Sequence, residues 1–272
     1  MNVKLGICNF CVPGTGVFAP RLVAEAGLDG MSIEFGTYEN GFPLSNRRIQ
    51  DAYREARERH GIEYCNIGCS GFDFIPFHAH RGHALYDIVK KFVKDAIDAA
   101  AYLEIPLVFM PAFHASAIDT EDEFRRAAEM FRYACDLASE KGIKIGSENM
   151  MDSERQLRLC EEVGRDNFGI FYDSDNYFYN KGYDQIEILD AVYDRIVPQL
   201  HVKDGKRGVL AGALLGTGDA GFYDVMAYLR KRNYEGWLII ENLYEREPLR
   251  ALNEDVYATF RQDVEILKSA VK

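Results

Sequence analysis

The fold is decided by four short apolar stretches: IKIGSE (residues 143–148), FGIFYD (168–173), IVPQLH (196–201) and GWLIIE (236–241). Each ends in a residue that can bind a metal, and these residues are Glu148, Asp173, His201 and Glu241. Apolar runs of this length, bounded by turn residues, predict buried strands. The segments between them have helical patterns, so we expect the strands to be parallel. Because parallel strands end at one edge, we expect the four side chains to meet there in one site.

The same alternation extends toward the N-terminus. Further strands are predicted at 3–9, 30–36, 61–68 and 105–110, and helices at 20–26, 46–60, 85–103, 120–140, 153–163, 185–193, 223–232 and 255–271. Thr120 and Glu123 have the spacing of a capping box. Eight strand–helix pairs in 272 residues predict a single-domain (β/α)8 TIM barrel over residues 1–272. A doubly wound open sheet is the alternative, but PGTG (13–16) lacks the expected GxGxxG spacing.

The composition narrows the classes of partner. The formal net charge is −11, which disfavours nucleic acid and anionic membranes because phosphate binding needs clustered Lys and Arg. No apolar run approaches 18 residues, and the first strand begins almost at Met1 without a signal peptide. We therefore expect a cytoplasmic protein with a small-molecule partner and no membrane partner.

Four of the six cysteines lie near predicted strand ends: Cys8, Cys11, Cys65 and Cys69. A zinc site is conceivable, but zinc pairs usually have tighter and more polar turns. A redox CxxC would open a helix, whereas here it is followed by VPG (12–14). We expect these residues to be small apolar wall residues. The loop residues His78, His80 and His83 fit no zinc spacing and are expected to be solvated.

Three motifs carry a family resemblance: GSEN (146–149), HVKD (201–204) and LGTGD (215–219) continuing to YEGWLIIE (234–241). With them the chain resembles the xylose-isomerase-like barrel superfamily of sugar isomerases and epimerases, and most of all its ketose 3-epimerase branch. The resemblance implies a TIM barrel that holds one divalent metal through Glu148, Asp173, His201 and Glu241. It is specific for the fold and the metal site and weak for the substrate.

The resemblance also implies substrate contacts. The branch places a Glu six residues after the first ligand, which matches Glu154, and an Arg six residues after the ligand His, which matches Arg207. It usually carries a His three residues after the Asp ligand, where this chain has Asn176. Asn can hydrogen-bond a sugar oxygen but cannot be cationic. This departure weakens the inference about the substrate and leaves the metal site unaffected.

Further candidate substrate-binding residues are predicted from their positions near the ends of predicted strands. Glu34 lies near the end of the second predicted strand, and His114 follows the fourth. Lys203 is expected to point toward the site, and Asp204 to have a structural role. We therefore predict Glu34, His114 and Lys203 as additional substrate-binding residues.

Three carboxylates and one imidazole form a hard donor set that suits Mn²⁺, with Mg²⁺ or Co²⁺ as alternatives. Such a cation stabilises an enediolate formed next to a ketone. Glu148 and Glu241, the predicted catalytic residues, come from strands three apart on the ring. One can remove a proton and the other return it on the opposite face, which epimerises the carbon.

The prediction is therefore a metal-dependent isomerase or epimerase that acts on a ketose or related keto-polyol. The same groups serve an inosose-type dehydratase and a hydroxypyruvate-type isomerase, so these reactions stay open. A non-catalytic sugar- or metal-binding protein is the alternative of a different class. An abasic-site endonuclease is disfavoured by the net charge and by the single His at a ligand position. The sugar, its phosphorylation and a homo-oligomeric state are also open.

Overall fold

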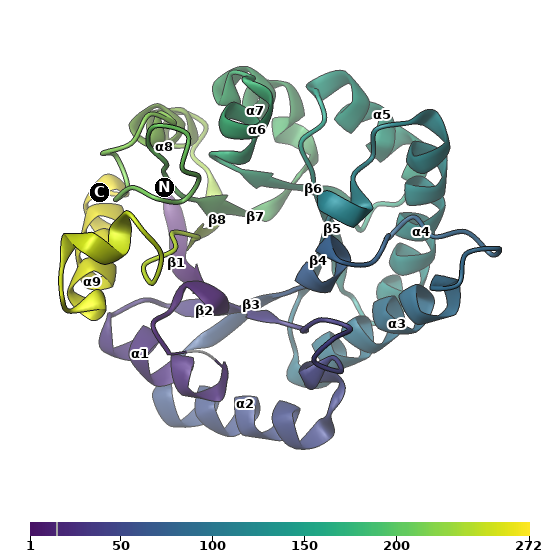
Figure 1. The fold of residues 1–272 in the computed structure, drawn as a ribbon, viewed down its shortest axis with the longest axis horizontal. Coiled ribbons are helices and arrows are strands. Elements are labelled where there is room, and N and C mark those ends of the chain that lie inside the picture. The colour runs from purple at the N-terminus through teal and green to yellow at the C-terminus, as the bar shows by residue number, and fades with distance from the viewer. Residues whose placement is uncertain (15) are drawn as a thin grey trace.

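The computed structural model describes residues 1–14 and 16–272, and it confirms the predicted barrel. Parallel strands close in chain order, and β1 pairs with β8. Figure 1 shows the strands at the centre and the helices in a ring around them. The strands are β1 (Asn2–Cys8), β2 (Gly30–Glu34), β3 (Glu63–Gly68), β4 (Leu107–Pro111), β5 (Lys144–Glu148), β6 (Phe168–Asp173), β7 (Ile196–Val202) and β8 (Glu235–Ile240).

The helices follow the strands as the apolar periodicity predicts. They are α1 (Ala19–Glu25), α2 (Arg47–His60), α3 (Tyr86–Leu103), α4 (Glu121–Ser139), α5 (Ser153–Val163), α6 (Asn176–Lys181), α7 (Gln185–Val192), α8 (Phe222–Lys231) and α9 (Val256–Ala270). Short 3-10 helices in the loops include η1 (Asn9–Cys11), η4 (Ser70–Asp73) and η5 (His114–Ser116). The core lies between strands and helices, where side chains such as Val93, Phe131, Leu229 and Val264 are fully buried. Within the described residues, none of the helices is long and apolar enough to cross a lipid bilayer.

One helix, α6, was not predicted from the sequence. It is short and aromatic, and its first turn depends on a side chain from the preceding strand. Asp173 Oδ1 accepts the backbone N–H of Asp175 at 2.8 Å and of Asn176 at 2.7 Å. These bonds satisfy donors that the first helical turn leaves free. By contrast, the predicted capping box of α4 is confirmed, with Thr120 and Glu123 each accepting the other's backbone N–H.

The strand register brings the ends of the strands to one level. Asp173 on β6 is the direct partner of His201 on β7. Val202 on β7 pairs with Ile240 on β8, and the N–H of Glu241 continues that ladder to the carbonyl of Val202 at 3.0 Å. Successive strand residues point to opposite sides, so this register sets which side chains enter the barrel together.

Asp204 binds several backbone N–H groups of the loop after β7. Asp204 accepts the backbone N–H groups of Gly216 and Gly218 at 2.9 Å, and also those of Gly205 and Ala220. A Cβ at Gly218 would lie 2.1 Å from Asp204 Oδ1, so the close approach needs glycine there. The structural role expected for Asp204 agrees with these contacts.

Candidate metal centre

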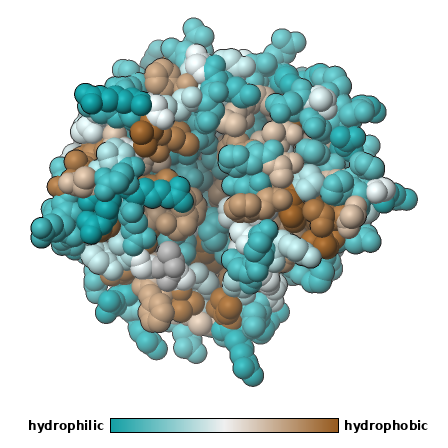
Figure 2. Space-filling view, viewed as in Figure 1, coloured by the Kyte–Doolittle hydropathy of each residue, from teal (hydrophilic) through white to brown (hydrophobic). Residues whose placement is uncertain are grey.

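The four predicted ligands lie together at the carboxyl ends of β5, β6, β7 and β8. Glu148, Asp173, His201 and Glu241 each offer a donor atom, and these atoms all lie within 4.8 Å of one another. His201 Nδ1 is 3.2 Å from Glu148 Oε1 and 3.4 Å from Glu241 Oε2. It is 3.7 Å from Asp173 Oδ2. Figure 2 shows that the centre of the face in view is hollowed, inside the ring of helices seen in Figure 1.

The two carboxylate oxygens of Asp173 have different roles, one in the fold and one in the candidate metal centre. Oδ1 starts α6, as described above. Oδ2 is buried and accepts no hydrogen bond of good geometry from the described residues. Its close neighbours are the ammonium of Lys203, with Nζ at 3.0 Å, and the imidazole of His201, with Nδ1 at 3.7 Å. A buried carboxylate oxygen that accepts no hydrogen bond keeps lone pairs free for a cation.

The charge balance also fits a cation. Three carboxylates meet at the centre, and Lys203 brings one permanent positive charge to them. Burial opposes a charge on Lys203, but Asp173 and Glu241 outweigh it and hold the lysine pKa well above its usual value. A divalent cation together with this ammonium would balance the three negative charges. Isolated buried charge is costly, so such neutralisation is strongly favoured.

The two candidate bases have different environments. Burial raises the pKa of Glu148 to about 7, although His201 opposes the shift. Burial would also raise the pKa of Glu241, but the ammonium of Lys203 and the imidazole of His201 hold it below its usual value. Two carboxyls with pKa values pushed apart are typical of an acid–base pair.

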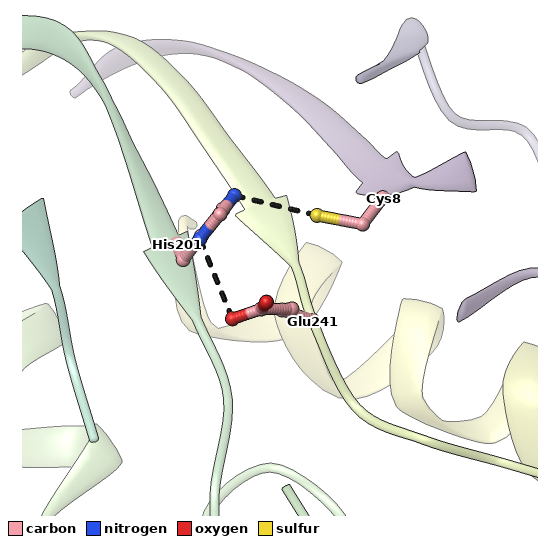
Figure 3. A group of neighbouring side chains, drawn as sticks. All are labelled: Cys8, His201 and Glu241. Atoms are coloured by element: carbon pink, nitrogen blue, oxygen red, sulfur yellow. Dashed lines mark hydrogen bonds and ion pairs between the residues drawn. The ribbon is translucent and has the colours of Figure 1, made fainter. Parts of the chain in front are cut away.

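The imidazole of His201 is fully buried and is contacted from both sides. Nδ1 faces the carboxylates, and Nε2 lies 3.3 Å from Cys8 Sγ (Figure 3). The rings of Phe109 and Phe171 approach the imidazole edge-on, with centroids at 5.3 Å and 4.6 Å. The contact with Cys8 was not predicted, because the two residues are 193 positions apart. The one sequence signal for this contact was the position of Cys8 at the end of a predicted strand.

Of the predicted substrate-binding residues, two lie at the centre. Asn176 Nδ2 donates to Glu148 Oε1 at 3.3 Å, and Lys203 Nζ donates to Glu241 Oε2 at 2.5 Å. Glu34 is half-buried at the end of β2, where it accepts a hydrogen bond from Ser70. His114 is exposed at the start of η5.

The other two lie at the surface. Glu154 is exposed on the first turn of α5. Arg207 is exposed in the loop after β7, and its backbone N–H donates to Asp219 Oδ2 at 3.0 Å. Within the described part of the chain, no hydrogen bond or ion pair joins either side chain to the centre.

Other motifs fall outside the centre. His80 and His83 are exposed, and His78 contacts the carbonyl of Ala117 at 3.1 Å. These histidines belong to neither cluster of potential metal donors in residues 1–14 and 16–272. One acidic group near the site was missed, because nothing in its aromatic loop marked it. Asp73, on η4, has a buried Oδ1 without a hydrogen-bond partner among those residues, and burial raises its pKa to about 6.

Comparison with known proteins decides the family. The model of the xylose isomerase-like TIM barrel family matches residues 20–269. The chain belongs to this family. The predicted superfamily resemblance is thereby confirmed.

Two curated relatives and one solved structure are similar to the chain. A 2-epi-5-epi-valiolone 7-phosphate 2-epimerase from Actinoplanes sp. is 27% identical over 85% of this chain and 83% of its own length. An inosose dehydratase from Glaesserella parasuis is 27% identical over 92% of both chains. The structure of D-psicose 3-epimerase with D-tagatose from Clostridium cellulolyticum H10 superposes with a TM-score of 0.80. That match covers 99% of this chain and 100% of that one at 13% identity, and at this identity it shows the shared fold alone.

Proposed function

We propose that the chain is a divalent-metal-dependent epimerase that acts at the carbon next to the carbonyl of a keto-polyol. The observation that carries the proposal is the pair of carboxylates that approach His201 Nδ1, Glu148 at 3.2 Å and Glu241 at 3.4 Å. Their pKa values shift in opposite directions. Two carboxylates at one centre provide a base that can remove a proton and a partner that can return one.

Glu148, Asp173, His201 and Glu241 would hold the cation. The oxygen-rich donor set favours Mn²⁺, with Mg²⁺ and Co²⁺ as alternatives. When bound, the cation supplies Lewis-acid polarisation of the substrate ketone, which makes the neighbouring C–H bond more acidic.

The protein groups then carry the proton. One carboxylate removes it from one face of the substrate carbon, and the other returns a proton to the opposite face. Each base has its own hydrogen-bond donor, Asn176 for Glu148 and Lys203 for Glu241. The neutral amide and the ammonium give the two carboxylates different environments. Glu34 and His114 are proposed as substrate contacts at the mouth of the barrel. Glu154 and Arg207 stay predictions from the family pattern.

The substrate class is proposed from the relatives. The matched proteins are named for a valiolone phosphate and an inosose, and both names denote polyhydroxy ketones. The loss of one proton beside the ketone begins either an epimerisation or a dehydration. A keto-polyol, phosphorylated or free, is therefore the substrate class that we propose.

Dehydration is the second candidate function. It is favoured by the inosose dehydratase relative, which matches over 92% of both chains. Lys203 provides an ammonium beside Glu241 that can stabilise the negative charge of a departing hydroxyl. In this reaction, removal of the proton is followed by loss of a neighbouring hydroxyl as water.

The test is solvent exchange. The purified protein, loaded with Mn²⁺, is incubated in D₂O with inososes, ketohexoses and valiolone 7-phosphate, and the products are examined by NMR after the metal is chelated. Glu148→Gln and Glu241→Gln are compared at saturating metal. Exposed Glu161→Gln on α5 is the control.

Deuterium beside the carbonyl, with inversion and no loss of hydroxyl, supports the epimerase. Deuterium accompanied by loss of water supports the dehydratase. We expect each variant at the centre to lower turnover by about 10²- to 10⁴-fold, the usual contribution of a positioned acid or base. Stoichiometric metal binding without exchange on any of these ketones would overturn the enolising function.

A further inference from the structure

Cys8 is the only protein group among the described residues that contacts Nε2 of His201 by hydrogen bonding. Its Sγ lies 3.3 Å from that nitrogen, while the opposite nitrogen, Nδ1, faces the carboxylates (Figure 3). Both side chains are fully buried, so bulk water does not reach Nε2 readily. The two aromatic rings beside the imidazole, Phe109 and Phe171, have no lone pair to offer an N–H group.

This arrangement bears on where the imidazole proton lies. A neutral imidazole has one N–H group and one free lone pair. If the proton lies on Nδ1, it points at Glu148 and Glu241 and no lone pair is available to a cation. If it lies on Nε2, the lone pair of Nδ1 faces the carboxylates. The acceptor beside Nε2 therefore decides whether His201 is ready to bind a metal.

We propose that Cys8 is a positioning residue of the metal centre, with Sγ accepting the Nε2–H of His201 so that Nδ1 presents its lone pair to the cation. The inference rests on the proposed metal dependence. In metal sites the second histidine nitrogen usually donates to a carboxylate, a carbonyl or water, and that partner fixes the tautomer and the ring orientation. A thiol performs this role here from β1, at the other end of the sequence.

The choice of sulfur has a physical reason in the charge of the centre. Three carboxylates, one ammonium and one divalent cation already sum to zero. A carboxylate in place of Cys8 would add a buried negative charge without a partner, which is costly. A neutral thiol accepts the N–H without changing that balance, although sulfur is a weak acceptor.

Two other roles for Cys8 make different predictions. If the thiol only fills space, an apolar replacement of similar size should serve as well as a polar one. If sulfur is itself a ligand, a thiophilic cation should be bound by Cys8, His201 and Glu241, whose donor atoms lie within 4.8 Å of one another. The observed distance of 3.3 Å is near the roughly 3.5 Å between S and N at a tetrahedral zinc, so the experiment has to separate the two cases.

The test compares Cys8→Ser, Cys8→Ala and Cys8→Val in the full chain, with Cys135→Ala as the control for loss of a buried thiol on α4. The dissociation constants of Mn²⁺ and Mg²⁺ are measured by calorimetry without substrate. The tautomer of His201 is read from long-range ¹H–¹⁵N spectra of Mg²⁺-loaded protein labelled with [¹⁵N]His and assigned with His201→Asn. Co²⁺-loaded protein is examined for a sulfur-to-metal charge-transfer band. Circular dichroism checks that each variant is folded.

The proposal predicts an Nε2–H tautomer in the unmodified protein. It also predicts that metal binds about 10- to 100-fold more weakly to Cys8→Ala and Cys8→Val, with Cys8→Ser intermediate because its hydroxyl can accept a hydrogen bond. Cys135→Ala should bind like the unmodified chain. Equal or tighter binding by Cys8→Val than by Cys8→Ser would overturn the proposal in favour of packing. A charge-transfer band that disappears in Cys8→Ser would overturn it in favour of direct ligation.

The same data separate this inference from the proposed function. Normal metal binding by every Cys8 variant removes the positioning role and leaves the proposed epimerase intact. Failure of the unmodified protein to bind Mn²⁺, Mg²⁺ or Co²⁺ overturns the metal-dependent function and this inference together. Weakened metal binding in Cys8→Ala without activity on any tested ketone supports the positioning role alone.

Discussion

Lys203 Nζ lies 2.5 Å from Glu241 Oε2, and the two side chains are only 4% and 16% exposed. The same ammonium is 3.0 Å from Asp173 Oδ2. Lys203 therefore holds two of the four proposed metal ligands and supplies part of the positive charge that the buried carboxylates need. A divalent cation and Lys203 share this task, so removing one should increase the demand for the other.

Lys203→Met is expected to destabilise the metal-free protein by about 3–5 kcal/mol, because it leaves a buried carboxylate without its partner. The stabilisation by Mn²⁺ should be larger in the variant than in the unmodified chain, since the cation then neutralises more uncompensated charge. Chemical unfolding with and without metal measures both effects. The control is Lys4→Met, whose pair with Glu63 is about half exposed and is worth no more than about 1 kcal/mol. Weaker metal stabilisation of Lys203→Met would contradict the shared neutralisation.

The divided role of Asp173 can be tested with two substitutions. Asp173→Asn keeps an oxygen that can accept the N–H groups of Asp175 and Asn176 but loses the negative charge. It should lower metal affinity by roughly 100-fold or more, at least the effect of losing an outer partner of a metal ligand, with little change in metal-free stability. Asp173→Ala should lose affinity equally and also lose about 1 kcal/mol of stability with the cap.

Calorimetric metal titration and urea unfolding of the two variants provide the measurements. Asp194→Asn is the control, because the side chain of Asp194 is 91% exposed. Equal stability of the Asn and Ala variants would show that the contact with α6 contributes nothing. Unchanged metal affinity in both would remove Asp173 from the proposed ligands.

The parts of the site that could be predicted from sequence are those fixed by strand ends. Glu148, Asp173 and His201 each end an apolar run, and parallel strands bring such ends together. Helix α6 could not be predicted in this way, because its first turn depends on Asp173 Oδ1 rather than on the pattern of its own residues. The contact of Cys8 with His201 joins the two ends of the chain, which only closure of the barrel brings near each other.

Two of the predicted substrate contacts, Glu154 and Arg207, lie at the surface. Glu154, on the first turn of α5, and Arg207, in the loop after β7, have the spacing of the family pattern, but spacing along the sequence does not fix where a side chain points. Both are exposed in this structure. The prediction was stronger where regular backbone geometry sets the direction of the side chain, as it does at the end of β7 for His201.

The capping box of α4 is expected to affect the stability of the protein without affecting the metal centre. Thr120 Oγ1 accepts the N–H of Glu123 at 3.2 Å, and Glu123 Oε2 accepts the N–H of Thr120 at 2.8 Å. Thr120→Ala should cost about 1 kcal/mol in the free energy of unfolding, while metal affinity stays unchanged. The control is Glu161→Ala, because the side chain of Glu161 is exposed. Thr217→Ala is not suitable, because the hydroxyl of Thr217 donates a hydrogen bond to the carbonyl of Leu214. A loss of metal affinity in Thr120→Ala would contradict a purely local role.

Asp263 gives the stability a pH dependence that can be separated from the metal centre. This residue of α9 is buried, and it accepts hydrogen bonds from Asn242 at 2.6 Å, Tyr244 at 2.7 Å and the N–H of Leu215 at 2.7 Å. Burial raises its pKa from 3.8 to about 6, and the neighbouring Asp204 adds to the shift. A raised pKa means that folding favours the protonated form. The stabilising contribution is therefore complete below about pH 4 and is lost as the pH rises through about 6.

The shift corresponds to about 3 kcal/mol, since each pKa unit is worth about 1.4 kcal/mol. Asp263→Asn cannot ionise, so any cost of its altered hydrogen bonds is the same at every pH. The stability of the variant relative to the unmodified chain should therefore rise by about 2 kcal/mol between pH 4 and pH 7, the range in which most of the shift acts. Urea unfolding of metal-free protein across this range measures the difference, with Asp194→Asn expected to show none because its side chain is exposed. A constant difference between Asp263→Asn and the unmodified chain would mean that Asp263 ionises in the folded protein as it does in the unfolded chain.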